Sequence, residues 1–396
     1  MISSQALAVF DMDPARTNVV LTIDGCDLNL GPRERLTSAR ANVSHHLTRF
    51  RSQLSRPIPK LADLSQAIRQ LDYHMGQLAL QLVNDNTALL DEVRRRLVDA
   101  WPQWQQSNEI IPLIEVRGHD GDFPFELLPL LDSTEVTEFV NYAEAENALH
   151  RFLAFGAVIR RTTGETAVVD NLRADPLPVQ LLSYEIPDTG SGFESLEPHD
   201  GIEVEGPWPD PESALEPATF MKLLVDALYD PTKALDGGTR TRPVQIQHFA
   251  CHGDTTDKTD SDFTLLLGGP HERERRISLG AIRHGFRQRE ARLVPPSDAR
   301  PLVIANACGS AVIDKASHRS FHQFFLNNRY RGFIGTEADV PTGVAVAFSV
   351  RFYEALLEGR PIGEAVVRAR QRLFTERGNP LGLLYVLYGD PFLGIG

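Results

Sequence analysis

Short apolar segments alternate with amphipathic segments along the chain, and their periodicity distinguishes strands from helices. The first part predicts a strand at 18–24 and helices at 38–52, 61–84 and about 87–100. Within 61–84, apolar residues recur at alternating spacings of four and three, which is typical of the seam between two packed helices. We expect this seam to face the core or a neighbouring helix, and the alternative is a surface that docks another protein. The seam consists of Leu64, Ile68, Leu71, Met75, Leu78 and Leu82.

The middle of the chain combines further strands with one helix and one acidic segment. Segments 110–116, 155–161 and 178–184 predict strands, and segment 138–155 predicts a helix. Residues 185–217 contain ten acidic residues, no Lys or Arg, and several Pro and Gly residues. This composition favours an exposed loop that acts as a solvated connection, with an acidic lid as the alternative.

From residue 218 onward the pattern becomes regularly α/β. The segment 301–307 (PLVIANA) is almost continuously apolar, which is typical of a central parallel strand buried on both faces. Strands that alternate with amphipathic helices predict a mostly parallel sheet covered by helices. The expected strands are 244–250, 263–269, 301–307, 332–336 and 383–389, and the expected helices are 218–229, 278–290, 343–358 and 362–376.

Composition sets limits on this picture. The 396 residues are enough for one large domain or two smaller ones. Lys and Arg number 40 against 53 Asp and Glu, and the net charge of −13 disfavours direct binding of nucleic acid. Cys26, Cys251 and Cys308 do not describe a disulfide framework and fit a reducing compartment. The sequence shows neither a signal peptide nor an apolar run of about 20 residues, so we expect a soluble cytoplasmic protein without a membrane span.

Two of the predicted parallel strands end in residues that can carry chemistry. The strand 244–250 is followed by Cys251 and His252, and the strand 301–307 is followed by Cys308. Working residues of open α/β sheets lie beyond the carboxyl ends of the strands, so His252 and Cys308 are expected at one edge. An imidazole beside a thiol can take its proton and create the nucleophilic thiolate. We therefore predict that Cys308 is a nucleophile and that His252 is its base.

Acyl transfer also needs hydrogen-bond donors for the oxyanion. The candidates are the backbone N–H of Cys308 and that of Gly253, which without a Cβ lets a substrate carbonyl approach closely. The alternative for Cys308 is a small buried residue, and for His252 it is a core histidine bonded to a backbone carbonyl. Alternation turns Cys251 away from His252, so we expect it to be buried. A zinc site that includes His248 is disfavoured, because the spacing fits no usual ligand pair.

The residues around both strand ends resemble a known family. HFACHGD at 248–254 is similar to the histidine motif of the CHAT proteases, which are relatives of caspases and separase. PLVIANACGSA at 301–311 is similar to the cysteine motif of the same family. The similarity continues through segments 114–128, 333–359 and 385–391.

The resemblance implies a division of the chain, a fold and a reaction. Residues 107–396 correspond to a CHAT protease domain, and residues 1–106 to an N-terminal region of helices and strands that forms a degenerate caspase-like half. The implied fold is a caspase-like three-layer α/β sandwich, with a mostly parallel central sheet and helices on both faces. The implied reaction is peptide-bond cleavage by a Cys–His dyad, matched here by Cys308 and His252, without a metal or cofactor.

The resemblance also suggests a substrate preference. Several relatives prefer a basic side chain before the scissile bond and hold it with a carboxylate. Asp339 is similar in placement to such a residue, and Glu337 and Asp254 are further candidates, while a solvated loop carboxylate is the alternative for Asp339. Ala338 stands where the family often has Trp, which changes the expected shape of the specificity pocket.

Relatives act as regulated proteases in bacterial antiviral defence and cell death. By resemblance we expect an endopeptidase that cuts a specific protein, such as a gasdermin-like pore former held inactive by its own tail. Many CHAT proteins carry helical repeats that receive a signal, and this sequence has none, so we expect control by the N-terminal region or by an activating protein partner. The alternatives are a catalytically decayed caspase-like binding or scaffold protein and a cysteine amidohydrolase that acts on small molecules.

Overall fold

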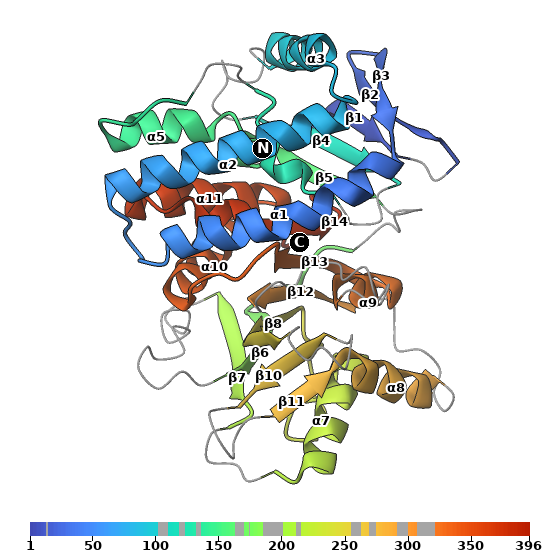
Figure 1. Cartoon of the computed structure of the whole chain (residues 1–396). Helices are drawn as coiled ribbons and strands as arrows, with labels where there is room; N and C mark the ends of the chain where they lie inside the picture. The colour runs from blue at the N-terminus through green and yellow to red at the C-terminus, as the bar shows by residue number, and fades with distance from the viewer. Residues whose placement is uncertain are drawn as a thin grey trace. The chain divides into compact units, whose positions relative to one another are not determined.

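The computed structural model describes residues 1–12, 15–101, 110–118, 123–131, 136–162, 170–173, 175–184, 201–210, 215–254, 263–268, 275–290, 300–306 and 321–396. The chain divides into two compact units (Figure 1). The first comprises Met1–Val168 and Val340–Gly394, and the second comprises Val169–Asp339 and Ile395–Gly396. The first unit is therefore built from two distant segments of the sequence. The boundary predicted between residues 106 and 107 lies outside the described residues and stays a prediction.

The first unit contains a mixed sheet. Its strands are β1 (Ile2–Asp11), β2 (Asn18–Ile23), β3 (Cys26–Pro32), β4 (Ile111–Arg117) and β5 (Val158–Thr162), in the order β3-β2-β1-β4-β5. β1 pairs antiparallel with β2 and parallel with β4, and β4 pairs parallel with β5. The sequence pattern does not predict β1, because Ser3, Ser4 and Gln5 interrupt its apolar residues.

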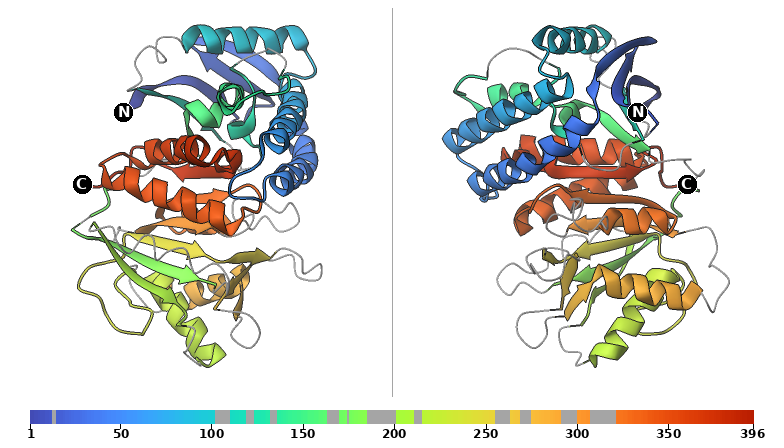
Figure 2. Two further views of the ribbon diagram at one scale, coloured as in Figure 1. Left: turned by 90° about the vertical axis from the view of Figure 1, so that its left-hand side faces the viewer. Right: turned by 45° about the vertical axis from the view of Figure 1, so that its right-hand side comes forward.

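Helices from both ends of the sequence pack in the first unit. They are α1 (Glu34–Gln53), α2 (Leu61–Leu82), α3 (Thr87–Ala100), α5 (Tyr142–Leu149), α6 (Leu153–Gly156), α10 (Thr342–Leu357) and α11 (Ile362–Arg377), with η1 (Phe125–Leu127), η4 (Pro380–Leu384) and the strand β14 (Tyr385–Gly389). α1 and α2 lie side by side (Figure 2). Every apolar seam residue of α2 is buried, so the prediction that this seam faces the interior is confirmed.

The second unit is built on parallel strands. They are β6 (Leu177–Ser183), β7 (Ile202–Trp208), β8 (Ile246–Ala250), β12 (Arg300–Asn306) and β13 (Tyr330–Thr336), in the order β13-β12-β8-β6-β7. Each neighbouring pair within this order is parallel. A small antiparallel sheet of β9 (His252–Asp254), β10 (Thr264–Leu267) and β11 (Arg275–Ser278) follows β8 in the chain. The described helices of this unit are α7 (Pro217–Tyr229), α8 (Leu279–Glu290) and α9 (Phe321–Asn327).

Side chains of β8 show how the helices cover this sheet. Gln247 donates a hydrogen bond to the carbonyl of Ala227 in α7 (3.1 Å), and the ring of Phe249 lies 5.6 Å from that of Phe321 in α9. Because side chains alternate along a strand, His248 points to the opposite face of the sheet. Helices packed on parallel central strands confirm the predicted α/β fold class. Among the described helices, none is both long enough and apolar enough to cross a membrane.

The strand β7 corrects the expectation that 185–217 is a loop throughout. Its acidic residues are matched by arginines, since Glu205 lies 2.6 Å from Arg240 and Glu203 pairs with Arg242. Trp208 at its end stacks on Phe220 of α7, with 4.6 Å between the ring centroids. Glu203 and Glu205 therefore belong to an edge strand, and the rest of the predicted loop lies largely outside the described residues.

Candidate active site

The carboxyl ends of β8 and β12 meet at one edge of the sheet. The two strands are parallel neighbours, and their register places Ala250 opposite Asn306. His252 follows Ala250 by two residues, and Cys308 follows Asn306 by two residues. Each predicted catalytic residue thus lies two residues beyond one member of the Ala250–Asn306 pair. Neighbouring strands are about 4.8 Å apart. Cys308 itself lies outside the described residues.

The position of His252 is set by two sets of contacts. Its backbone begins β9, where His252 pairs with Leu266 of β10. The ring of Tyr184 meets the imidazole edge-on, with 4.8 Å between the centroids. The backbone N–H of Tyr184 also donates to the carbonyl of Ala250 (2.9 Å). His252 as a whole is half-buried.

The residues on either side of His252 differ in exposure. Cys251 is only 7% exposed, which confirms the prediction that it is buried. Gly253 is half-buried and pairs with Leu265 of β10. Its role as an oxyanion donor stays a prediction.

A second histidine of β8 lies in the interior of the same sheet. The side chain of His248 is completely buried, and its Nε2 lies 3.0 Å from Nδ2 of Asn306 at the end of β12. Burial lowers the pKa of His248 to about 3, because the charged imidazolium would lose its hydration. Within the part of the chain that the structure describes, no three His, Cys, Asp or Glu side chains are grouped as metal ligands. The sequence gives no role to the contact between His248 and Asn306.

The candidate specificity carboxylates follow the strands of this edge. β13 is the other parallel neighbour of β12, with Ile334 opposite Ile304. Glu337 comes directly after β13 and is only 4% exposed, whereas Asp339 is exposed. Asp254 ends β9, opposite Thr264. Asp339 is therefore the more accessible of the two carboxylates beyond β13. Ala338 between them is buried.

Comparisons with known proteins agree with these features. Residues 212–381 match the sequence model of the CHAT domain. A protein of Vitiosangium sp. (strain GDMCC 1.1324) named "Probable protease" is 28% identical over 151 residues. That alignment covers 37% of this chain and 18% of the relative, so the chain spans well under two thirds of the relative's length.

Similar solved structures are more distant. The complex of Porphyromonas gingivalis RgpB pro- and mature domains has a TM-score of 0.44 and 10% sequence identity, covering 81% of this chain and 72% of that chain. The Saccharomyces cerevisiae separase–securin complex has a TM-score of 0.43 and 11% identity, covering 96% of this chain and 30% of that chain.

The matched region contains both strand ends described above. It begins before α7 and ends in η4, so it includes His252, Cys308 and the carboxylates Glu337 and Asp339. The histidine motif at 248–254 and the cysteine motif at 301–311 lie within it, whereas segments 114–128 and 385–391 lie outside it. Residues 212–381 of the chain are therefore similar to the CHAT domain.

Proposed function

We propose that the protein is a cysteine endopeptidase in which Cys308 is the nucleophile and His252 the general base. The observation that carries this proposal is the equal offset of the two residues beyond the Ala250–Asn306 pair of β8 and β12. The CHAT domain match over 212–381 supports it, because the match includes both motifs.

The proposed reaction follows from the chemistry of a thiol and an imidazole. His252 takes the proton of the Cys308 thiol, and the thiolate sulfur attacks the carbonyl carbon of the peptide bond. The backbone N–H groups of Cys308 and Gly253 stabilise the oxyanion. The C–N bond then breaks as His252 returns the proton to the leaving amine. Water hydrolyses the resulting thioester and regenerates the free thiol.

Alkylation of the thiol tests this assignment without knowledge of the substrate. Iodoacetamide is added to the Cys26→Ser protein, because Cys26 is exposed, and modification of Cys308 is followed by mass spectrometry. We expect fast, pH-dependent alkylation of Cys308 that falls by about tenfold or more at pH 7 in His252→Ala, since the thiolate then has no base. Equal rates of Cys308 alkylation with and without His252→Ala would contradict the proposal.

We further propose that cleavage follows a basic residue and that Asp339 is the residue that recognises it. Its exposure makes it available to a substrate, whereas Glu337 is buried. A peptide library that varies the residue before the cut should show preference for Arg or Lys, reduced in Asp339→Asn. Glu337→Gln and Asp254→Asn serve as comparisons. Unchanged selectivity in Asp339→Asn would contradict the role of Asp339, and lost selectivity in one of the other two variants would identify that carboxylate as the one that recognises the basic residue.

The proposed substrate is a specific protein, such as a gasdermin-like pore former in a defence or cell-death system, and the proposed control is an activating protein partner. Co-expression with the products of neighbouring genes tests this, with Cys308→Ala as the matched control. Cleavage of one product by the wild type alone is expected. Stable binding with no cleavage would instead favour a scaffold role. Placement in the cytoplasm stays a prediction from the cysteine content.

A further inference from the structure

His248 and Asn306 form a buried contact between the two strands that lead to the candidate active site. The Nε2 of His248 lies 3.0 Å from Nδ2 of Asn306. In the register of β8 and β12, Asn306 is opposite Ala250, and His248 is opposite Ile304. The Asn306 side chain therefore reaches diagonally back across the strands. The contact ties the last residue of β12 to the buried interior of β8.

The chemistry of the two groups fixes the direction of this hydrogen bond. An amide nitrogen only donates, so Nε2 of His248 accepts and the other ring nitrogen carries the proton. The pKa of His248 is lowered to about 3 by burial, so its imidazole stays neutral at the pH values where a Cys–His dyad works. Nε2 of His248 therefore remains a hydrogen-bond acceptor for Asn306 throughout the proposed reaction.

We propose that His248 is a positioning residue, which holds the Asn306 amide and thereby fixes the direction in which the chain leaves β12 toward Cys308. This inference rests on the proposed function, since it matters only if Cys308 reacts. A single residue separates Asn306 from Cys308, so a small rotation at Asn306 displaces the sulfur. A displacement of about 1 Å in a catalytic group costs on the order of 10²-fold in rate.

The test compares alkylation of Cys308 by iodoacetamide in variants of the full chain that all carry Cys26→Ser. His248→Leu lacks an acceptor, and its alkylation rate constant at neutral pH is expected to fall about tenfold or more. In His248→Gln the side-chain oxygen reaches the position of Nε2. Its rate is expected to stay within about twofold of the wild type, with the same dependence on pH.

Gln247→Leu is the matched control for general damage to β8. Gln247 is equally buried and donates hydrogen bonds to Gln180 (3.2 Å) and to the carbonyl of Ala227 (3.1 Å), on the opposite face from His248. It should lower the melting temperature and leave the alkylation rate unchanged. A wild-type rate in His248→Leu, or equal losses in His248→Leu and Gln247→Leu, would overturn the positioning role.

A second measurement applies where His248→Leu does not fold. Nitrogen NMR of the wild-type imidazole should show Nε2 of His248 as the unprotonated acceptor at neutral pH, and a protonated Nε2 contradicts the inference. Failure of the proposed function has a different signature. In that case Cys308 reacts at the same rate in the wild type and in His252→Ala. If the reaction depends on His252 and not on His248, only the positioning role falls.

Discussion

Tyr184 shows why single residues around a site escape sequence motifs. Its ring meets His252 because β6, which it follows, is the neighbour of β8. The order of strands in a sheet is not contained in the local pattern of any one strand. His252 and Cys308 could be named as candidates from the sequence because each follows a recognisable strand. The contacts of Tyr184 could not be predicted, because they depend on which strands pair.

Replacing the ring of Tyr184 should therefore disturb the orientation of His252, the candidate general base. An edge-on ring contact is worth about 0.5–1.5 kcal/mol, so Tyr184→Leu should slow alkylation of Cys308 by roughly twofold to tenfold. Tyr184→Phe keeps the ring and should react at close to the wild-type rate. The iodoacetamide rate at pH 7 measures both variants. Similar rates for Leu and Phe would show that the ring does not orient His252.

His248 makes the folded state sensitive to acid. Burial lowers its pKa from 6.5 to about 3, so the unfolded chain takes up this proton first as the pH falls. Above about pH 6.5 the imidazole is neutral in both the folded and the unfolded chain, so it does not lower the free energy of unfolding. Between about pH 6.5 and pH 3 only the unfolded chain binds the proton, so the free energy of unfolding falls progressively as the pH falls. Urea unfolding should show that the wild type loses up to about 1.4 kcal/mol more per pH unit in this range than His248→Gln. Parallel stability curves would contradict this expectation.

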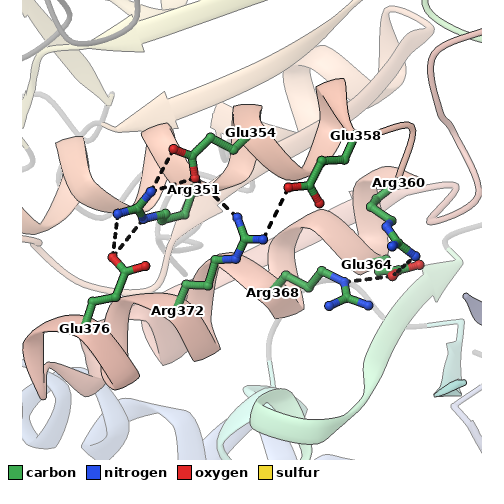
Figure 3. A network of polar contacts seen from close by, with 8 residues as sticks. All are labelled: Arg351, Glu354, Glu358, Arg360, Glu364, Arg368, Arg372 and Glu376. Atoms are coloured by element: carbon green, nitrogen blue, oxygen red, sulfur yellow. Dashed lines mark hydrogen bonds and ion pairs between the residues drawn. The ribbon is translucent and has the colours of Figure 1, made fainter. Parts of the chain in front are cut away.

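At the scale of elements, α10 and α11 of the first unit are connected by a row of ion pairs (Figure 3). Arg351 of α10 contacts Glu354 and, in α11, Glu376, at 2.7 Å each. Glu364 differs from these, since its side chain is only 1% exposed and accepts from Arg368 at 2.8 Å. Burial alone would raise the pKa of Glu364, but the hydrogen bond from Arg368 helps to hold that pKa below its ordinary value. The row thus contains one buried carboxylate, Glu364, and several partly exposed ion pairs whose attraction is weakened by water.

This difference in burial predicts different costs for two similar substitutions. Glu364→Gln should lower the free energy of unfolding by about 1–3 kcal/mol, because a charged hydrogen bond is lost in a buried position. Glu376→Gln, at an exposed pair, should cost less than about 1 kcal/mol. Urea unfolding at neutral pH measures both. Equal costs would mean that the pairs are equivalent despite their exposure.

The start of α3 is easier to predict from the sequence than an edge strand. α3 spans the predicted 87–100, since the Asn86 side chain accepts a hydrogen bond from the N–H of Leu89 (3.1 Å) and so fixes its start. The pattern does not predict β7, because its glutamates resemble a solvated loop until Arg240 and Arg242 are placed beside them. Those arginines lie far along the chain, so only tertiary structure brings the charges together.

At the scale of the whole molecule, the first unit is discontinuous in sequence. β1 lies between β2 and β4, and α10 and α11 come from the segment beyond residue 340. The segment before residue 107 therefore contributes the centre of a sheet as well as α1, α2 and α3. Motif similarity cannot report this arrangement, because motifs mark chemistry and do not contain strand order.

Removal of residues 1–106 should accordingly damage the rest of the first unit. Without β1, the strand β4 has an open edge and the apolar surfaces that α1 and α2 cover become exposed. A chain of 107–396 should aggregate on expression, and supplying 1–106 as a separate chain should increase its soluble fraction. Gel filtration measures both. A monodisperse, cooperatively unfolding 107–396 would contradict this expectation.

The same discontinuity affects the order of events on the ribosome. All of the second unit except Ile395–Gly396, and so both β8 and β12, is synthesised before the residues that close the first unit emerge. The early segments must therefore wait, with apolar surface exposed, until α10 and α11 are released. A message cut short just after codon 339 would encode the candidate nucleophile and base but an incomplete first unit. The exposed apolar surface of such a product makes it prone to aggregation.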